Sequence, residues 1–411
     1  MAEFLTASEA KAEVALRKLA KDKEYVIGLI NDAIDAGKYK MPLSEVSEEI
    51  IAKLRAAGYY VSKINQGEKQ HGYIVSWGDE VPTYEEASTP EDVANILSSG
   101  AEKVYVELKD NMNITQDNVI TIPAGTKATV KVDNTVTIDT EGFLVEDGAE
   151  LTLKGTGTIN VVDKTSSAHA VYASGPNAQV TLDGVTIDTI STSGKEGNTA
   201  YGIYLAQDAS VNFKSGIIKC AYGSCISTNN LTGGNTVVNI TGGELYSDGS
   251  YAVYLAAQGV CNINGGKVQG VNMRMGHLNV SGDAEIIPTT ITTEGYDNIG
   301  KEFATSGCVW LGDTIAVMAG TYADAKGTDT SVKVSGGATV KSNFRSAIGV
   351  YSVDTKAPQN VKVTVVNKDN VTTTDSDFEA IKVYDHAYIK AEADKVGKNY
   401  NPVAESNITI A

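Results

Sequence analysis

The chain has few of the residues that rigidify small or secreted proteins. Its 411 residues include four cysteines and eight prolines. The cysteines have neither CxxC spacing nor paired histidines, so they predict free thiols in a reducing cytoplasm rather than a zinc site or a disulfide framework. Only the first two lie close together in sequence. The four are Cys220, Cys225, Cys261 and Cys308.

Positive charge and long apolar runs are also scarce. The formal net charge is -17 at pH 7, and the only arginines beyond residue 80 are Arg274 and Arg345. Nucleic acid and anionic membrane surfaces both require a basic footprint, so neither is expected as a partner. No stretch approaches the ~18 consecutive apolar residues of a membrane-spanning helix. The N-terminal "MAEFLTASEAKAEVALRK" has no continuous apolar segment, so no signal peptide is expected.

Recognisable catalytic motifs are missing too. The chain has no GxGxxG, P-loop or HExxH pattern. Its isolated histidines, His169, His277 and His386, are expected to be solvated turn residues. The acidic residues near glycine corners form no repeated pair of the kind that two-carboxylate hydrolysis requires. We therefore predict a non-enzymatic protein without metal or cofactor. The acidic residues considered are Asp183, Asp188, Asp208, Glu244 and Asp248.

Residues 1–80 differ from the rest by their helical periodicity. Helices are predicted in "SEAKAEVALRKLAK", "KEYVIGLINDAIDAG" and "SEEIIAKLRAAG", and "YYVSKI" and "YIVSW" then predict a β-hairpin. This is a small α+β domain of three helices and a hairpin. The order also suits a winged-helix DNA-binding domain. Its recognition helix, however, would offer only Lys53 and Arg55 against Glu48 and Glu49.

Residues 81–103 are predicted to be a linker and a capping helix. Thr89 is a good N-cap, and Pro90 is tolerated in the first turn. Glu91 and Asp92 complement the helix dipole. A helix here would cover the open end of the β-structure that follows.

The chain has 40 glycines, and two short phrases alternate through most of residues 149–268. One is a strand that runs into a glycine corner, as in "TVVNITGGEL" (236–245) and "GVCNINGGKV" (259–268). The other is a shorter strand, as in "AVYL" (252–255). Repeats with three short strands each are typical of a parallel β-solenoid. Residues 287–307 and 312–329 break the pattern, and they are expected to form irregular turns.

Alternation within the shorter phrase assigns its faces. The second and fourth residues are mostly aliphatic and are predicted to stack inside the solenoid. The first and third residues are then predicted to face outward and to form one strip of aromatic and small side chains. The strip comprises Tyr172, Tyr204, Tyr254 and Trp310, with Ala170, Gly202, Ala252 and Cys308.

This strip has three interpretations. In the first, the face assignment is inverted and the aromatics belong to the core. In the second, the aromatics stack against sugar rings. In the third, the strip is a chain–chain interface. In an interface, small residues let backbones approach and aromatics fill the gaps. An uncharged apolar strip on an acidic molecule needs such a reason. We favour the chain–chain interface.

The repeated "V-x-[IL]-x-G-G-x-[IV]" and "A-[IV]-Y-L" phrases resemble right-handed parallel β-helix proteins of the pectate-lyase-like kind, which include phage tailspikes and fibres. This resemblance covers roughly 104–411 and concerns fold rather than activity. The first 80 residues resemble a small attachment module of phage virion proteins. The segments that carry this second resemblance are Thr6–Ala12, Ala33–Tyr39, Leu54–Val61 and Tyr73–Gly78.

The resemblance implies a structural protein of a phage particle, a homotrimeric head fibre or capsid decoration protein. Residues 1–80 would attach to the capsid or to another virion protein, and the β-helix would project from the particle surface. The projecting part would contact host or mucosal glycans. The alternative is a tail fibre or tailspike-type enzyme, a polysaccharide lyase or hydrolase. A bacterial adhesin is disfavoured because no signal peptide is visible.

Overall fold

The computed structural model divides the chain into two compact units, Met1–Thr83 and Tyr84–Ala411. Among the residues that the structure describes, no helix has the length and apolar character needed to cross a membrane. The described residues are 21–33, 40–44, 47–56, 60–66, 70–76, 84–162, 168–189, 200–228, 235–290, 312–318, 329–352, 360–395, 397 and 406–411.

The first unit combines helices with a three-stranded antiparallel sheet of order β1-β3-β2. Residues 21–33 are helical, and most of them belong to the second predicted helix (23–37). The first predicted helix (8–21) lies outside the described residues except for Lys21. The hairpin strands extend into the stretch expected as its turn. The other elements are β1 (Lys40–Ser44), α2 (Glu48–Ala56), β2 (Tyr60–Gln66) and β3 (Gln70–Ser76).

Strand β1 was not expected from the sequence, because Pro42 lies in its middle. β1 is an edge strand, and proline is tolerated at sheet edges. Met41 and Leu43 point into the core of this unit, and Pro42 is exposed between them. This core also contains Ile51 from α2 and Val75 from β3.

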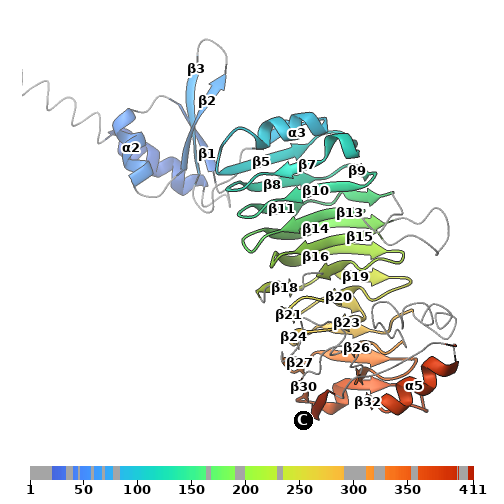
Figure 1. Cartoon of the computed structure of the whole chain (residues 1–411). Coiled ribbons are helices and arrows are strands. Elements are labelled where there is room, and N and C mark those ends of the chain that lie inside the picture. The colour runs from blue at the N-terminus through green and yellow to red at the C-terminus, as the bar shows by residue number, and fades with distance from the viewer. Residues whose placement is uncertain are drawn as a thin grey trace, which may run out of the picture. The chain divides into compact units, whose positions relative to one another are not determined.

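The second unit is mainly β and consists of long parallel sheets (Figure 1). One sheet has ten strands and the other has twenty. The larger sheet contains two ladders, because β14 and β16 are eleven residues long and run through both. The chain therefore visits three ladders in turn, and each strand pairs in parallel with its equivalent from the next repeat. This arrangement is compatible with a parallel β-helix.

The ten-stranded sheet follows the shorter phrase of the repeat. Its strands are β7 (Ile120–Ile122), β10 (Glu141–Val145), β13 (His169–Ser174), β15 (Tyr201–Ala206), β17 (Ile226–Thr228), β20 (Val253–Leu255), β23 (Val271–Met273), β26 (Ile315–Met318), β29 (Ile348–Tyr351) and β32 (Ile381–Tyr384).

The two ladders of the larger sheet flank the glycine corners. The first contains β4 (Glu85–Ala87), β5 (Lys103–Leu108), β8 (Lys127–Val132), β11 (Glu150–Lys154), β14 (Gln179–Thr189), β16 (Ser210–Cys220), β18 (Thr236–Ile240), β21 (Gly259–Ile263), β24 (Gly276–Val280), β27 (Asp329–Val334), β30 (Asn360–Val365) and β33 (Asn407–Ile410). The second contains β6 (Met112–Ile114), β9 (Thr135–Ile138), β12 (Thr158–Val161), β19 (Glu244–Ser247), β22 (Lys267–Gln269), β25 (Glu285–Ile287), β28 (Thr339–Ser342) and β31 (Val371–Thr373), together with the ends of β14 and β16.

One apolar core runs through the second unit. Alternate residues of the strands are buried, as the pleat requires. The inward positions predicted for the shorter phrase are confirmed at most strands, for example at Val171 and Ala173 of β13, which are fully buried. The pattern weakens at the last strand, β32, where Ile381 is half-buried and Val383 is exposed.

The glycine corners are required by close stacking of successive repeats. Gly266 has a φ of +79°, and a Cβ there would lie 2.6 Å from the carbonyl oxygen of Gly243 in the preceding repeat. Gly243 itself has a φ of +74°. Glycine alone adopts this conformation freely and leaves room for the neighbouring backbone.

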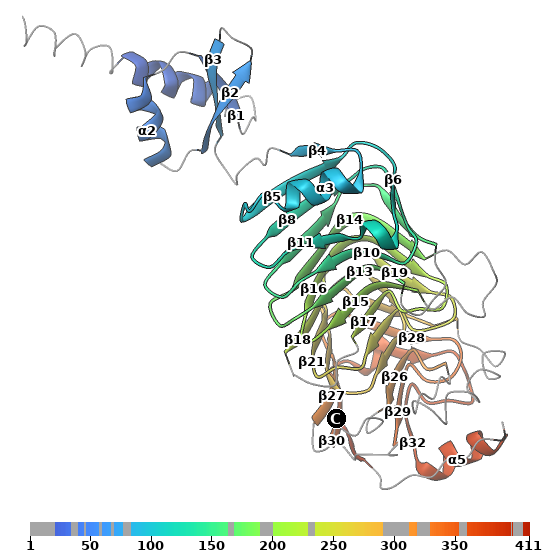
Figure 2. The ribbon, with the colours of Figure 1, turned by 45° about the horizontal axis from the view of Figure 1, so that its top comes forward.

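Helix α3 (Pro90–Leu97) lies across the end of the stack (Figure 2). The predicted cap is confirmed, because Thr89 and Asp92 form a reciprocal capping box. Val93 and Leu97 are buried against the first strands. Helix α5 (His386–Lys395) follows β32, and 3₁₀ turns occur at Gln116–Asn118 and Lys368–Asn370.

Candidate functional site

The outward third residue of the shorter phrase forms a row along the ten-stranded sheet. Tyr172 lies beside Tyr204, Tyr204 beside Ser227, and Ser227 beside Tyr254. The structure therefore places three of the predicted aromatics in one row, half-buried. The row continues through Asn272, Ala316, Gly349 and Lys382.

The small residues of the predicted strip do not face outward. Ala170 and Ala252 are fully buried, and Gly202 is buried too. A Cβ on Gly202 would lie 2.6 Å from both Cys225 O and Ile218 Cγ2. The strands begin with two successive inward residues where the chain rounds the corner from the second ladder, so strict alternation fails there. These residues are small because the corner is tight.

Trp310 and Cys308 lie outside the described residues. Strands β23 and β26 are direct neighbours in the sheet. Ala316 takes the place in the row that was expected for Trp310.

An aromatic cluster surrounds the first part of the row. His169 stacks on Tyr201 with ring centroids 5.8 Å apart, and it meets Tyr204 edge-on at 4.9 Å. Tyr172 and Tyr204 stack at 5.7 Å with their planes 14° apart. His169 was expected to be a solvated turn residue, and this is wrong, because it is only 6% exposed. The repeated H-x-x-Y and Y-x-x-Y spacing of "HAVY" and "YGIY" is the signal that would have identified the cluster.

Burial lowers the pKa of His169 to about 4. The ring is therefore neutral at pH 7 and unsuited to act as a proton donor there. Within the described part of the chain, its Nδ1 atom has no hydrogen-bond partner. The cluster is an apolar packing unit that contains one titratable ring.

The ring geometry disfavours sugar stacking on this row. A stacking platform needs a free aromatic face, but Tyr172 and Tyr204 turn their faces toward each other. At Tyr254, the guanidinium of Arg274 lies 5.1 Å from the ring centroid. Arg274 is itself only 1% exposed. The faces of these tyrosine rings thus contact other side chains of the same chain.

A second outward row, on the first ladder, is an asparagine ladder. Asn239 Nδ2 donates to Asn212 Oδ1 at 2.9 Å, Asn262 Nδ2 to Asn239 Oδ1 at 3.0 Å, and Asn279 Nδ2 to Asn262 Oδ1 at 3.0 Å. Each middle amide both donates and accepts along the stack. The ladder holds four successive outward side chains in one orientation, and it leaves a flat, uncharged surface.

Asp188, at the end of β14, and Asp248, just after β19, lie close enough to interact electrostatically. Burial raises the pKa of Asp188, Lys219 opposes this, and the Asp248 carboxylate adds to it. Beside them, burial together with a 2.7 Å hydrogen bond to Glu244 raises the pKa of Tyr246 to about 12. Asp183 is not part of this group and instead accepts a hydrogen bond from Ser215 at 2.7 Å.

A buried carboxylate lies over the outer face of β29. Asp313 Oδ1 accepts hydrogen bonds from the Tyr384 hydroxyl at 2.8 Å and from Ser346 N at 3.0 Å, and Oδ2 accepts one from the Tyr351 hydroxyl. Burial raises the pKa of Asp313. Asp313 is fully buried, so its carboxyl group faces the tyrosine hydroxyls of this end of the unit and not a substrate.

Helix α5 is attached beside this carboxylate by further buried polar groups. Arg345 Nη1 donates to the Tyr388 hydroxyl at 2.9 Å, and Nη2 lies 3.7 Å from Glu392 Oε2. Both charged side chains are less than a tenth exposed. The ion pair therefore joins the loop before β29 to α5.

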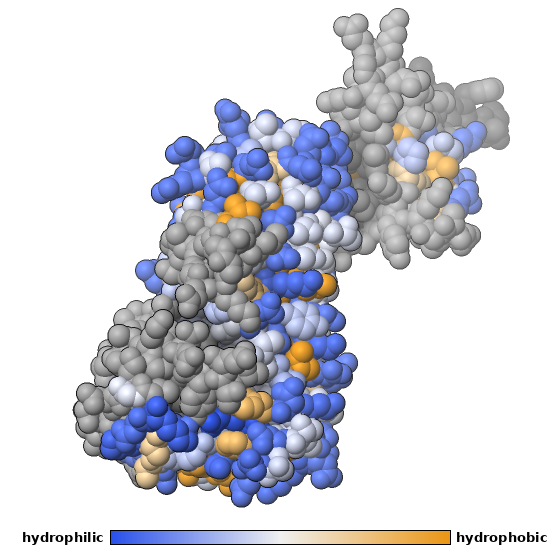
Figure 3. Space-filling view, turned by 90° about the vertical axis from the view of Figure 1, so that its right-hand side faces the viewer, coloured by the Kyte–Doolittle hydropathy of each residue, from blue (hydrophilic) through white to orange (hydrophobic). Residues whose placement is uncertain are grey.

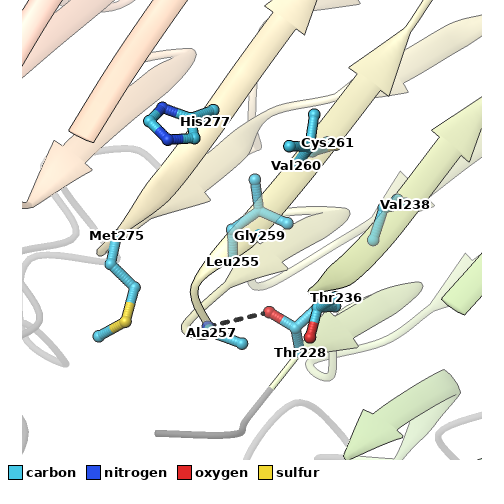
Figure 4. A pocket seen from close by; sticks show the side chains of 10 residues that line it. All are labelled: Thr228, Thr236, Val238, Leu255, Ala257, Gly259, Val260, Cys261, Met275 and His277. Atoms are coloured by element: carbon cyan, nitrogen blue, oxygen red, sulfur yellow. Dashed lines mark hydrogen bonds between the residues drawn. The ribbon is translucent and has the colours of Figure 1, made fainter. Parts of the chain in front are cut away.

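Figure 4 shows a pocket between β18 and β24. Its empty volume is about 200 Å³, with the open mouth included. The Thr228 hydroxyl on its wall already accepts hydrogen bonds from Ala256 N and Ala257 N. Among the described residues, no group of three or more His, Cys, Asp or Glu is arranged to hold a metal ion.

The described surface in Figure 3 is mostly hydrophilic, with hydrophobic residues scattered over it. Isolated surface hydrophobics of this kind need no ligand to explain them. The described large hydrophobics that are exposed on the second unit come from separate places in the chain, Val162, Val366, Val383 and Ile410.

The features that bear on function are thus the outward rows of the sheets and the buried groups beneath them. The pocket between β18 and β24 is lined by one histidine, His277, and by no carboxylate. No protein-family model, curated protein or solved structure matches the chain.

Proposed function

We propose that this chain is a non-enzymatic structural protein of a phage particle, a homotrimeric head fibre or capsid decoration protein. Its first 80 residues attach to the capsid or another virion protein. The rest forms a closed, right-handed parallel β-helix that projects from the particle and contacts host or mucosal glycans. The protein has no cofactor, and it is made in the host cytoplasm before assembly.

The asparagine ladder is the observation that carries this proposal. Its four outward side chains form hydrogen bonds with one another, namely Asn212, Asn239, Asn262 and Asn279. These amides therefore link successive strands, although they lie on a face where a ligand would bind. The tyrosine row likewise packs on itself. A surface of this kind suits a structural protein exposed on a particle better than it suits an enzyme that binds and releases substrate. The net charge of -17 keeps many displayed copies from clumping.

Electron microscopy of purified particles with a gold-labelled tag on Ala411 tests the particle role. We expect label at a fixed distance outside the capsid, at regularly spaced sites. Particles without label, with all the protein free in the lysate, would refute it. Label confined to the tail would move the protein from head fibre to tail fibre.

We place the chain–chain contact of the trimer on the outward face of β18, β21 and β24, because like-charged chains meet most easily where charge is lowest. The nine outward side chains there include no acidic residue, lysine or arginine. Val237 and Val260 are adjacent and half-buried on this face. The remaining seven are Asn239, Thr241, Asn262, Asn264, His277, Asn279 and Ser281.

Light scattering of the wild-type chain and of Val260→Glu tests this contact. We expect a trimer for the wild type and a monomer for Val260→Glu, because three new carboxylates would meet at the interface. Thr158→Glu places the same charge on the second ladder, and the trimer should persist. A wild-type monomer, or a trimer unaffected by Val260→Glu, would show the placement to be wrong.

A polysaccharide lyase or hydrolase is the second candidate, because burial and Asp248 raise the pKa of Asp188. A carboxyl with a raised pKa is what a general acid requires. An assay for reducing ends and unsaturated uronates on a glycan panel decides between the two. Release that disappears in both Asp188→Asn and Asp248→Asn would establish the enzyme. The structural proposal expects no release from the wild type.

A further inference from the structure

Two rows of side chains face each other where the chain passes from the second ladder to the ten-stranded sheet. The first row consists of the last inward residues of the second ladder. The opposing row consists of the first inward residues of the ten-stranded sheet. Their proximity is direct at one corner, where a Cβ on Gly142 would lie 2.2 Å from Ile138 Cδ1. The first row is Ile138, Val161, Thr189, Cys220 and Ser247, and the opposing row is Gly142, Ala170, Gly202, Cys225 and Ala252.

One corner differs from the others in this set. At the other corners the opposing row has a glycine or an alanine, as at Ala170 after Val161. At the corner between β16 and β17 both positions are cysteine. Cys220 is the last residue of β16, and Cys225 directly precedes β17. Only four residues separate them, so the pair closes one tight turn.

The side chains of this pair meet in the corner. Cys225 Sγ lies 3.3 Å from Ile218 O, two residues before Cys220, and 3.0 Å from Tyr246 O on the neighbouring strand β19. The Cys220 side chain lies close enough to the Cys225 thiol to help raise the pKa of Cys225. Both residues are buried, Cys220 at 4% exposure and Cys225 at 0%. Neither thiol is in a disulfide.

We propose that Cys220 and Cys225 are a disulfide site, oxidised when the folded protein leaves a reducing compartment and meets a low-molecular-weight disulfide such as oxidised glutathione. The Cys220 thiolate attacks one sulfur of the oxidant, whose S–S bond breaks, and one glutathione leaves. The Cys225 thiolate then attacks the Cys220 sulfur, and the second glutathione leaves. The two cysteines lose two electrons and two protons, and the oxidant becomes two thiols.

The order of the steps follows from burial. Cys220 is the slightly more accessible thiol and receives the oxidant first. Burial raises the pKa of Cys225 well above its usual range, so its thiolate is scarce at neutral pH. Closure of the disulfide is therefore the slow step. Its rate rises about tenfold for each pH unit above 7, because the thiolate fraction does.

The experiment uses the reduced full-length protein incubated with oxidised glutathione at pH 7, 8 and 9. Free thiols are alkylated under denaturing conditions, and peptides are mapped by mass spectrometry. We expect a Cys220–Cys225 linkage with the loss of two hydrogens, forming faster at higher pH. Cys261, buried in β21 without a cysteine partner among the described residues, should be alkylated throughout. In Cys225→Ser, Cys220 should instead retain one glutathione.

Full alkylation of both cysteines after oxidation overturns the proposal. So does glutathione that persists on Cys220 of the wild type, or a linkage of either residue to another cysteine. Because the assay needs only the folded chain, its result is independent of whether the protein belongs to a particle.

Discussion

At the scale of single residues, His169 links the aromatic cluster to pH. Its pKa is about 4 in the folded chain and about 6.5 in an unfolded one. The stability that this depressed pKa contributes is complete above pH 6.5 and is lost as pH falls toward 4. We predict that the free energy of unfolding falls by about 2.5 kcal/mol between pH 7.5 and 4.5 through this residue. Urea unfolding at several pH values measures the decrease.

His169→Phe is the matched control, because phenylalanine keeps an aromatic ring but does not titrate. The variant should lose this component of the pH dependence and keep the rest. An identical decrease in both proteins would show that His169 does not carry the effect.

Residue-level alternation could be predicted from the sequence, and its failure has one physical cause. The aliphatic positions such as Val171 and Ile203 are buried as expected. The preceding small positions, Ala170 and Gly202, were predicted to face outward because a period of two was extended across a corner. At a corner two successive residues point inward, and only the tertiary packing reveals where that occurs. The burial of His169 has another origin, because its ring packs against Tyr201 and Tyr204.

At the scale of elements, the glycine corners set the spacing between repeats. We predict that Gly266→Ala lowers the free energy of unfolding by about 2 to 4 kcal/mol, from backbone strain at positive φ and overlap with Gly243 O. Gly100→Ala is the control, because Gly100 has a φ of +77° but nothing within 4 Å of an added Cβ. That variant should cost about 1 kcal/mol. Equal costs would show that stacking is not the constraint.

The asparagine ladder allows a second test at this scale. In Asn239→Asp the side chain still accepts from Asn262 but can no longer donate to Asn212, whose oxygen it then faces. We predict a loss of about 1 to 3 kcal/mol in the free energy of unfolding. Asn113→Asp changes an exposed residue of β6 in the same way and should cost far less. Thermal unfolding of the two variants side by side distinguishes them.

Strands that carry one of the two repeated phrases could be predicted from the sequence, and strands without them could not. The shorter phrase "AVYL" predicted β20, and the phrase that ends in a glycine corner predicted β18 and β21. Strand β23 has only the residues "VNM", and its outward Asn272 is fully buried. Such a strand is specified by its neighbours in the sheet rather than by its own pattern. The same holds for β1, because its proline argues against a strand when the sequence is considered alone.

At the scale of the whole molecule, α3 covers one end of the stacked sheets. We predict that Val93→Asp makes the chain associate in a concentration-dependent way, because a charge at a fully buried position displaces the helix and uncovers strand edges. Asn95→Asp, on the exposed side of the same helix, should not. Light scattering over a range of concentrations compares them. Association in neither variant would show that the end is protected by other means.

The parallel register has a consequence for the length of the molecule. Gln179 of β14 pairs with Glu150 of β11 on one side and with Ser210 of β16 on the other. Removing residues 179–209 would therefore bring Ser210 opposite Glu150 with every later pairing unchanged. Duplicating that segment would add one repeat in the same way. The length of the second unit then changes in steps of about 4.8 Å, the spacing between paired strands. Duplication or deletion of one repeat in the gene therefore lengthens or shortens the protein without requiring a new kind of contact.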